Sequence, residues 1–552
     1  MRICLPLLIA FAVNLSHAAS LHSCPAGVQA AGSHEARITL PDGGARRVFV
    51  SGEESIAGCR SMRLPVPLES IAGLRPLASG DPGETLFLHG PADGQGSEIE
   101  SVSAAGSDSP PGGRTMPLRE DLLAHLRLQT FGSEERAQAE LADGRLRLHC
   151  GAGGKPAGVI LRGPWAATRA RADIVLQASG NGRFALQVLD EAAAARGEAH
   201  ALGAFDAGAP ARHAISLPPT RYDPAAWQGF VLVCPPDAAS LQVDALRVMP
   251  RAGDVAGRSA WVWDARAWRE RPQEVFAHAQ RHALRTLFVS VPVREGRVDD
   301  PQALAAFIRR AGALGLSVWS VDGDAQMVLP QEHAPSAARV RAYADYNRSV
   351  EAAARLQGAQ FDVEHYLLPG YELDAQAWDR RYLELARALH EAAGGLPLEF
   401  VMPFWWADKQ ALLQGLAPLA SGLTVMDYRT RREEILALAQ PFLDWGVRHG
   451  RRVRIALEAG PVAPERQHRF TRAGSGELWL LDFERTPVLL LLTAPRPNPG
   501  GIAYRRVSSR ILDGSATTFH GDPGRLLRML PELEGELSAW TSFGGIALHE
   551  LK

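Results

Sequence analysis

The first 250 residues carry short apolar runs with the two-residue alternation of β-strands, separated by glycine, proline and serine. Residues 19–100 contain runs such as Ala36–Leu40 and Glu84–His89, which predict a small β-rich region. Residues 101–140 open with SVSAAGSDSPPGGR, a composition typical of a linker or a long loop. Residues 141–250 carry several alternating runs at regular spacing, which predict a β-sandwich.

After Pro250 the apolar runs alternate with helical stretches rich in alanine, leucine and arginine. This rhythm predicts repeated strand–helix units and a parallel sheet. An additional apolar stretch, Leu478–Leu492, predicts an extra element between the last two units. Eight units in about 300 residues indicate a (β/α)8 TIM barrel over residues 255–552. The predicted strands are Ala260–Asp264, Thr286–Val291, Ser317–Val321, Gln360–Glu364, Glu399–Phe404, Gly422–Asp427, Val453–Glu458 and Gly545–His549.

The predicted fold class is therefore multidomain, with a C-terminal α/β barrel preceded by an all-β sandwich and a small β-rich N-terminal region. The sandwich resembles, in pattern alone, the jelly-roll modules that accompany many carbohydrate-active enzymes. That resemblance implies sugar binding, and a purely structural spacer is the alternative interpretation.

Composition narrows the possible partners. The chain has 552 residues, of which 46% are hydrophobic and 22% charged, so it can bury large cores and is not a disordered polymer. The 59 basic and 61 acidic residues give a formal charge of −2, and no basic block marks a nucleic-acid footprint. We therefore expect no nucleic-acid partner, and the sequence makes no prediction of the oligomeric state.

The N-terminus has the pattern of a signal peptide. Residues 1–18 combine Arg2, an apolar run from Ile3 to Leu15, and small residues at Ser16 and Ala18 suited to cleavage. No later stretch has the roughly 18 to 20 continuous apolar residues of a membrane-spanning helix. The sequence therefore predicts a secreted or periplasmic protein whose mature chain has no integral membrane segment.

Four cysteines remain after removal of residues 1–18, namely Cys24, Cys59, Cys150 and Cys234. An even number in an oxidising compartment predicts two disulfides, although the sequence leaves their connectivity open. Pairing Cys24 with Cys59 and Cys150 with Cys234 would keep each bond within one predicted segment. Leu21-His22-Ser23-Cys24 loosely resembles a lipobox, so an outer-membrane lipoprotein attached through Cys24 is the alternative.

Acidic residues follow the predicted barrel strands, at the end where barrel enzymes carry their sites. Asp362 and Glu364 are the sharpest pair, because residues two apart on a strand point to the same face. Two carboxylates in one site raise the pKa of at least one of them, which suits a general acid. The structural alternative is that both form ion pairs with arginines such as Arg380 or Arg429.

These residues resemble a known family signature. Gly358-Ala-Gln-Phe-Asp362-Val-Glu364 is similar to the end of the fourth-strand signature Asp-Gly-x-Asp-x-Asp-x-Glu of the family 18, chitinase-like glycoside hydrolases, with glutamines at two of its aspartate positions. Met426-Asp427-Tyr428 resembles the family's Met-x-Tyr, and Gly544–Glu550 resembles its last strand, with His549 in place of tryptophan. The resemblance implies that Glu364 is the acid, Asp362 its partner, and Tyr428 a substrate contact.

Glu458, at the end of the seventh predicted strand, points to a second scheme. Retaining glycosidases of other barrel families resemble this chain in placing one glutamate on strand four and another on strand seven, here Glu364 and Glu458. Glu458 is then either a catalytic group or a residue that orients Glu364 or binds sugar. The separation of the two carboxyl groups would distinguish retaining from inverting chemistry.

Other residues near the predicted strand ends could bind a saccharide, because flat rings stack on sugar faces and polar groups bind hydroxyls. Asp264 and Asp324 also fit helix caps, and half of the aromatic rings are expected to fill the barrel. The candidates are Tyr428, Asp427, Trp406, Trp263, Trp319, Asp324, Asp264 and His549.

Other chemistries lack their motifs. The sequence has no His-Glu-x-x-His, Cys-x-x-Cys, EF-hand loop, phosphate-binding Gly-rich loop or Gly-x-Ser-x-Gly elbow, so it predicts no metal site and no cofactor. The sequence therefore favours an exported glycoside hydrolase that acts on a poly- or oligosaccharide through Glu364, Asp362 and Glu458. The alternative is a non-catalytic carbohydrate-binding or cell-envelope protein on a degenerate hydrolase barrel.

Overall fold

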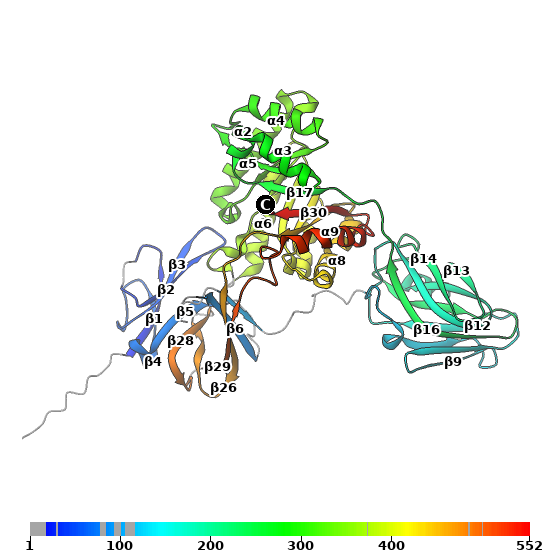
Figure 1. Cartoon of the computed structure of the whole chain (residues 1–552). Coiled ribbons are helices and arrows are strands. Elements are labelled where there is room, and N and C mark those ends of the chain that lie inside the picture. The colour runs from blue at the N-terminus through cyan, green and yellow to red at the C-terminus, as the bar shows by residue number, and fades with distance from the viewer. Residues whose placement is uncertain are drawn as a thin grey trace, which may run out of the picture.

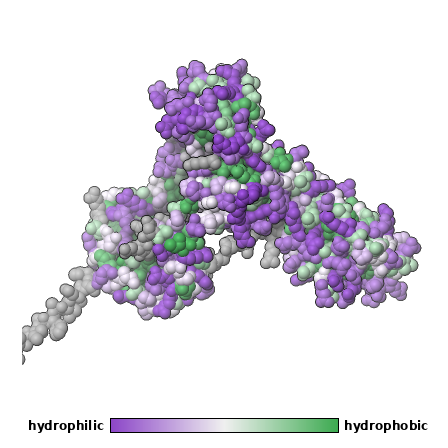
Figure 2. Space-filling model, in the orientation of Figure 1, coloured by the Kyte–Doolittle hydropathy of each residue, from purple (hydrophilic) through white to green (hydrophobic). Residues whose placement is uncertain are grey.

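The computed structural model describes residues 18–28, 31–77, 84–92, 101–104, 116–371, 374–483, 486–499 and 501–551. Figure 1 shows three lobes: a barrel with its helices, a β-sandwich at the right, and a pair of sheets at the lower left. Thirty strands and nine α-helices lie within these described ranges, so the molecule is built mainly from β-structure. Hydrophilic residues cover most of the face in view (Figure 2).

A four-stranded antiparallel sheet begins the described chain, in the strand order β2-β3-β1-β4. The sequence Val-Phe-Val-Ser of β3 is buried, because β3 lies inside the sheet between β2 and β1. A disulfide joins Cys24 to Cys59 beside β4. The sulfur that a lipid would need at Cys24 is thus bonded within the sheet. The strands are β1 (Ala18–Pro25), β2 (His34–Thr39), β3 (Ala45–Ser51) and β4 (Arg60–Pro67).

The sandwich follows as a nine-stranded antiparallel assembly. The alternating sequence Arg-Leu-Arg-Leu-His-Cys of β10 buries every second residue, which gives the strand one core face and one solvent face. The long strand β12 joins two layers, because its first half pairs with β14 and β16 and its second half with β13 and β15. A disulfide joins Cys150 to Cys234. The elements are β8 (Arg127–Phe131), β9 (Ala137–Ala142), β10 (Arg145–Cys150), β11 (Gly158–Arg162), β12 (Ala172–Asp190), α1 (Glu191–Ala195), β13 (His200–Ala207), β14 (Ala211–Leu217), β15 (Trp227–Val233) and β16 (Ala239–Pro250).

Eight parallel strands close into a barrel in chain order, with the last strand between the first and the seventh. Each strand lies on one of the predicted apolar runs. Strand bounds are β17 (Arg258–Val262), β18 (Leu284–Ser290), β21 (Ser317–Asp322), β22 (Ala359–Phe361), β23 (Leu398–Pro403), β24 (Gly422–Met426), β25 (Arg452–Glu458) and β30 (Phe543–His549). A small hairpin of β19 (Val293–Arg294) and β20 (Arg297–Val298) follows β18.

The helices around the barrel bury apolar residues against it, and four of them, α2, α4, α6 and α9, start at a capping aspartate. Asp300 accepts a hydrogen bond from Ala303 N–H at the start of α4, and Pro301 occupies the first helical position, where no backbone donor is required. Asp374 caps α6 in the same way. The helices are α2 (Ala265–Glu270), α3 (Pro272–Arg281), α4 (Pro301–Ala313), α5 (Pro330–Ser349), α6 (Ala375–Ala393), α7 (Gln410–Leu416), α8 (Arg432–His449) and α9 (Pro523–Leu537).

A seven-stranded antiparallel sheet combines two distant parts of the chain, in the order β5-β28-β27-β29-β26-β6-β7 (Figure 1). Its later strands are inserted between barrel strands β25 and β30, and they include the apolar stretch Leu478–Leu492. Its edge strands come from the N-terminal region. The strands are β5 (Ile71–Pro76), β6 (Thr85–Pro91), β7 (Ser101–Ala104), β26 (Glu465–Ala473), β27 (Gly476–Phe483), β28 (Thr486–Arg496) and β29 (Ile502–Leu512).

The predicted fold class, separate β modules followed by a C-terminal (β/α)8 TIM barrel, is wrong. Four antiparallel strands interrupt the barrel segment, and they share a sheet with strands from the N-terminal region. The C-terminal segment is therefore not a pure α/β barrel, and the N-terminal region is not a separate β module. Antiparallel sheets also outweigh the helices throughout the described ranges. Apolar periodicity identifies strands but not their partners, which is why the composite sheet escaped prediction.

Several features bear on the predicted location of the protein. The two disulfides are compatible with an oxidising compartment such as the periplasm or the extracellular space. Within the described ranges, no helix combines the length and apolar character required to cross a membrane. The predicted signal peptide falls almost entirely on residues 1–17, and most of the linker segment 101–114 falls on residues 105–115; both stretches lie outside the described residues.

Candidate functional site

The candidate site lies at the carboxyl ends of the barrel strands and starts at the loop after β22. This strand ends at Phe361, so Asp362 and Glu364 are in the following loop and not on the strand, contrary to the prediction. Asp362 N–H donates to the backbone oxygen of Asp322 at 2.9 Å. Gly323 permits this close approach, because a methyl group there would lie 2.2 Å from the backbone oxygen of Asp362.

Asp362 and Glu364 interact electrostatically although they are off the strand. Burial raises the pKa of Asp362 to about 7, and the negative charge of Glu364 contributes in the same direction. Asp362 Oδ1 is buried without a hydrogen-bond partner. Glu364 Oε2 accepts a hydrogen bond from the hydroxyl of Tyr366. Asp362 therefore keeps its proton up to about neutral pH beside a carboxylate that is held by tyrosine.

Glu458 and His549 form an ion pair across neighbouring strands β25 and β30. His549 Nδ1 lies 2.7 Å from Glu458 Oε2, and Gly460 N–H donates to Glu458 Oε1 at 2.6 Å. Burial opposes ionisation of Glu458, but the contacts with His549 and with backbone N–H groups outweigh it and lower its pKa. Burial likewise opposes protonation of His549, and the charges of Glu458, Glu550 and Asp362 raise its pKa overall. Both shifts favour the charged pair of a carboxylate and an imidazolium.

Tyr428 and Asp427 follow β24, and Tyr428 joins the cluster, whereas the charges nearest to Asp427 are those of Arg429 and Glu434 outside it. Burial raises the pKa of Tyr428, and the charges of Glu458, Asp362 and Glu364 raise it further, so these side chains lie around one space. The Tyr428 ring stacks on His549 with centroids 6.3 Å apart. Asp427 is fully buried, neither of its carboxyl oxygens has a hydrogen-bond partner, and burial raises its pKa well above the ordinary value. Burial thus favours the protonated, neutral form of Asp427.

The two tryptophans that were expected to contact substrate after β23 and β17, Trp406 and Trp263, have opposite exposures. Trp406 is fully buried against His365 and Tyr382, so its predicted contact with substrate is wrong. Its neighbour Trp405 is 48% exposed and Trp263 is 41% exposed. They follow β23 and β17, the fifth and first strands of the barrel, and therefore lie on opposite sides of its mouth.

Three further candidates have structural contacts that account for them. Trp319 lies edge-on to Phe288 and over Gly358, as part of the filling of the barrel. Asp264 caps α2 and forms ion pairs with Arg266 and Arg271. Asp324 caps the 3-10 turn Ala325–Val328 by accepting from Gln326 N–H at 2.7 Å. The structure brings none of these three into the acidic cluster.

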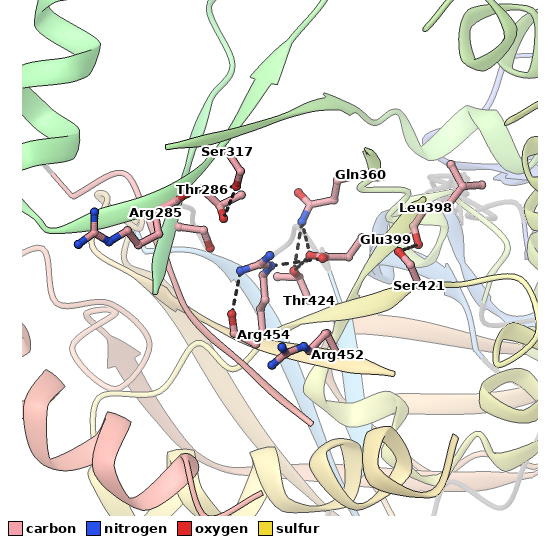
Figure 3. Close-up of polar contacts among 12 residues, drawn as sticks. Arg285, Thr286, Ser317, Gln360, Leu398, Glu399, Ser421, Thr424, Arg452 and Arg454 are labelled. Carbon is pink, nitrogen blue, oxygen red and sulfur yellow. Dashed lines mark hydrogen bonds and ion pairs between the residues drawn. The ribbon is translucent and has the colours of Figure 1, made fainter. Parts of the chain in front are cut away.

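The sequence interpretation missed a polar network inside the barrel (Figure 3). Trp261 Nε1 donates to Gln360 Oε1 at 2.6 Å, and Gln360 Nε2 donates to Glu399 Oε1 at 2.8 Å. Thr424 also donates to Glu399, and Arg454 neutralises it at 3.3 Å. Because Trp261 also contacts His549, this network supports the site from below. In the sequence, this network is marked only by Glu399 and Gln360, which are isolated polar residues within apolar strands.

Arg454 also lines a pocket of about 410 Å³ at the amino ends of the strands, together with Arg285 and Arg452. In Figure 3, Arg454 extends between Glu399 and the start of β30, where it donates to the Gly544 backbone oxygen at 2.8 Å. This pocket is at the end of the barrel opposite the acidic cluster. Its arginine therefore serves to compensate the buried charge of Glu399.

His365 was also missed, although it directly follows Glu364. The ring is fully buried among Tyr371, Tyr382 and Trp406, and burial lowers its pKa. Its Nε2 lies 3.7 Å from Asp379 Oδ1. This neutral imidazole packs the base of the loop that carries Glu364.

The described part of the chain contains no group of three histidine, cysteine, aspartate or glutamate side chains that could hold a metal ion. The side chains of the cluster can transfer protons and stabilise positive charge through carboxylates, with the Tyr428 ring beside them.

Comparisons with known proteins do not identify a family. No family model matches the sequence, and no curated protein matches it. Among solved structures, a GH18 chitinase from Cycas revoluta in complex with (GlcNAc)3 has a TM-score of 0.30 and 11% identity, over 53% of this chain and 94% of that one. The CBM22-1–GH10 modules of Clostridium thermocellum xylanase 10B, complexed with xylohexaose, have a TM-score of 0.25 and 9% identity, over 62% and 80%. A family 29 carbohydrate-binding module has a TM-score of 0.18 and 10% identity, over 23% and 80%. These similarities are too low to support an argument about function, so the residues must carry it.

Proposed function

We propose that this protein is an exported glycoside hydrolase that cleaves a poly- or oligosaccharide at the carboxyl end of its barrel. The observation that carries the proposal is the pairing of opposite protonation states in one cluster. Asp362 holds a proton to about pH 7, while the nearby Glu458 is an ionised carboxylate. Glycosidic cleavage requires such a division between a group that donates a proton and a group that stabilises positive charge.

In this mechanism Glu364 delivers the proton to the glycosidic oxygen, and Asp362 is the neighbour that stores it. Asp362 suits storage because burial keeps it protonated and its Oδ1 has no competing hydrogen bond. Tyr366 suits the role of positioning residue, since its hydroxyl donates to Glu364 and its ring packs edge-on against Trp405. The leaving sugar departs with the proton; water then adds to the other fragment and gives up a proton to the Glu364 carboxylate, which restores the acid.

Glu458 stabilises the positively charged transition state without attacking it. Both of its oxygens are engaged, one by His549 and one by the Gly460 N–H group, which fits a fixed electrostatic role better than that of a nucleophile. Tyr428 directs its hydroxyl among the same charges and binds a sugar hydroxyl or acetamide oxygen. Trp263 and Trp405 offer exposed rings for stacking on sugars at either side.

The test is release of new reducing ends from bacterial envelope and biofilm polysaccharides, chitin oligomers and plant glucans. The purified protein is compared with Glu364→Gln and with Glu433→Gln, an exposed control on α8 that removes the same charge. Hydrolysis by the wild type and the control, lost in Glu364→Gln, is the expected result. The rate should fall as pH rises above about 7, because Asp362 then loses the proton it stores.

A different pattern would favour the alternative of a non-catalytic carbohydrate-binding protein. In that case no substrate is cleaved, while the wild type and Glu364→Gln retain the same glycan in a binding assay. Hydrolysis that is unchanged in Glu364→Gln would exclude the proposed acid.

A further inference from the structure

Positive charge is concentrated on two strands of the seven-stranded sheet. β26 and β29 together carry six arginines and one acidic residue, Glu465, whereas the whole chain has a formal charge of −2. The strands are neighbours in the sheet. The arginines are Arg466, Arg469, Arg472, Arg505, Arg506 and Arg510.

Strand register separates these arginines between the two faces. On β26, Gln467 and Arg469 share one face, and Arg469 is directly opposite Phe87 of β6 and Ser508 of β29. Phe470, on the other face, belongs to the buried core. A groove of about 270 Å³ opens on the first face, which is near the lower end of the usual range for ligand sites. We call it the arginine groove; its lining is Thr85, Phe87, Gln467, Arg469, Ser508 and Arg510.

The groove holds guanidinium groups with little internal compensation. Arg510 donates from Nε to Gln467 Oε1 at 2.7 Å, a neutral partner that orients the arginine and leaves its charge unpaired. Arg469 is exposed, and the described residues form neither an ion pair nor a hydrogen bond with its side chain. Glu465, the acid of these strands, is directed to His89 at 2.8 Å. The two arginines therefore remain available to an external anion.

The groove offers the three kinds of contact that an acidic sugar requires. Arginine binds a carboxylate through paired N–H donors, the exposed Ser508 hydroxyl can bind a sugar hydroxyl, and the half-buried ring of Phe87 gives an apolar floor. The neutral Ser508 hydroxyl and the Phe87 ring beside the arginines fit a hydroxylated ring better than a string of phosphates. A uronic acid has all three complementary features on one ring.

The chain connects this sheet to the mouth of the barrel. Residues 459–464 lead from Glu458 directly into β26, and the return segment after β29 passes back over Glu458, where Phe519 N–H donates to its backbone oxygen at 2.9 Å. Short connections on both sides therefore join the strands that line the groove to the residues around Glu458. A polysaccharide fits this arrangement better than a free monosaccharide, because only a polymer is long enough to contact both the sheet and the barrel.

We infer that the arginine groove binds a segment of a uronic-acid-containing polysaccharide, and that such an acidic glycan is the polymer presented to the barrel. Only the second part of this inference, that the acidic glycan is presented to the barrel, rests on the proposed function. The groove is a binding site distinct from the carboxylate cluster, since none of its lining residues belongs to that cluster.

The experiment measures binding of the full-length protein to polygalacturonate, alginate and hyaluronan, with methyl-esterified polygalacturonate as a probe that has the same backbone without the charge. The test variant is Arg469→Gln with Arg510→Gln. The matched control is Arg472→Gln with Arg506→Gln, which removes the same charge from the same strands but lies opposite Tyr504 and Phe470 in the register. Thermal unfolding of all three proteins verifies that each is folded.

The test variant should lose affinity for at least one acidic polymer by about tenfold or more, because two charged hydrogen-bonding groups are removed. The control should change by about twofold or less, since a distant exposed charge is screened by salt. The methyl ester should not bind. Equal losses in both variants, or no binding of the three acidic polymers by the wild type, would overturn the inference. Binding of poly(dT) that exceeds that of every acidic glycan and is lost in the test variant would assign the groove to nucleic acid instead.

Failure of this inference can be separated from failure of the proposed function. Glu364→Gln should bind the acidic polymer as tightly as the wild type, because Glu364 is outside the groove. If the protein binds an acidic polymer but cleaves no polymer, the inferred binding site is supported and the proposed hydrolase activity is excluded. If the protein cleaves a neutral polymer but binds no acidic glycan, the hydrolase activity is supported and the inferred binding site is excluded.

Discussion

Asp362→Asn should stabilise the protein at alkaline pH, although it removes a residue of the proposed site. Asparagine has nearly the shape of a protonated aspartate and cannot ionise. Asp362 is coupled to Glu364 and partly buried, so its ionised form is disfavoured in the folded state. The substitution removes that cost while leaving the loop on its backbone contact with Asp322.

The size of the effect follows from the difference between folded and unfolded proteins. The pKa of Asp362 is about 7 when folded, against 3.8 for an ordinary aspartate. At about 1.4 kcal/mol for each tenfold change in acid dissociation, the folded state loses at most about 4 kcal/mol as pH rises through this window. Contact of the side chain with water reduces the value, so we expect about 2 to 4 kcal/mol at pH 8. At pH 4 the wild type and the variant should be nearly equal, because Asp362 is protonated in the folded state.

Urea unfolding followed by tryptophan fluorescence measures this difference between pH 4 and pH 8. Nine of the twelve tryptophans lie in the barrel strands, helices and loops, so the signal reports mainly on that lobe. Asp237→Asn is the control, since Asp237 is an exposed residue of the sandwich. The free energies of unfolding of the wild type and of Asp362→Asn should diverge steadily above about pH 4 and become parallel above about pH 7. Parallel curves over the whole range would refute the reasoning, because they would mean that Asp362 ionises as it does in an unfolded chain.

Three further predictions concern two tryptophans and a histidine near the site and a disulfide of the N-terminal sheet. Trp406→Ala should lower the free energy of unfolding by about 3 to 5 kcal/mol because the ring is fully buried, whereas Trp405→Ala should leave urea unfolding almost unchanged and weaken glycan binding. His365→Phe should reduce the loss of stability that urea unfolding shows as pH falls below 6.5. Burial lowers the pKa of His365 in the folded protein, so below the unfolded pKa the unfolded chain binds a proton that the folded protein does not, and the wild type loses stability. An unchanged pH profile would contradict this. Replacing Cys24 and Cys59 by serine should cost about 3 to 4 kcal/mol in chemical unfolding, because the bond closes a loop of 35 residues.

Much of the local structure was predictable because it depends on neighbours in sequence. Alternation in β10 and the apolar runs of the barrel strands reflect burial of side chains that are close along the chain. The pairing of β6 with β26 depends on residues far apart, and no local pattern records it. That pairing is the part of the architecture that overturned the predicted fold class.

The candidate site likewise contains features that the sequence predicted and features that it did not. Asp362, Glu364, Tyr428, Glu458 and His549 were all singled out as polar residues near strand ends, and the structure brings them together. Which tryptophan of an adjacent pair faces solvent depends on the turn after β23, where a 3-10 helix directs the second ring inward and the first outward. A local pattern gives no such direction once the strand has ended.

The composite sheet also has a consequence for how the chain reaches its native state. His89 and its neighbour Gln467 are separated by 378 positions, so β6 can acquire this partner only after more than four fifths of the polypeptide exists. At usual rates of synthesis this is a delay of roughly 20 to 75 s, during which an apolar strand waits with an open edge. Folding of this region is therefore delayed until late in synthesis, and premature association of exposed strand edges is a hazard during that delay.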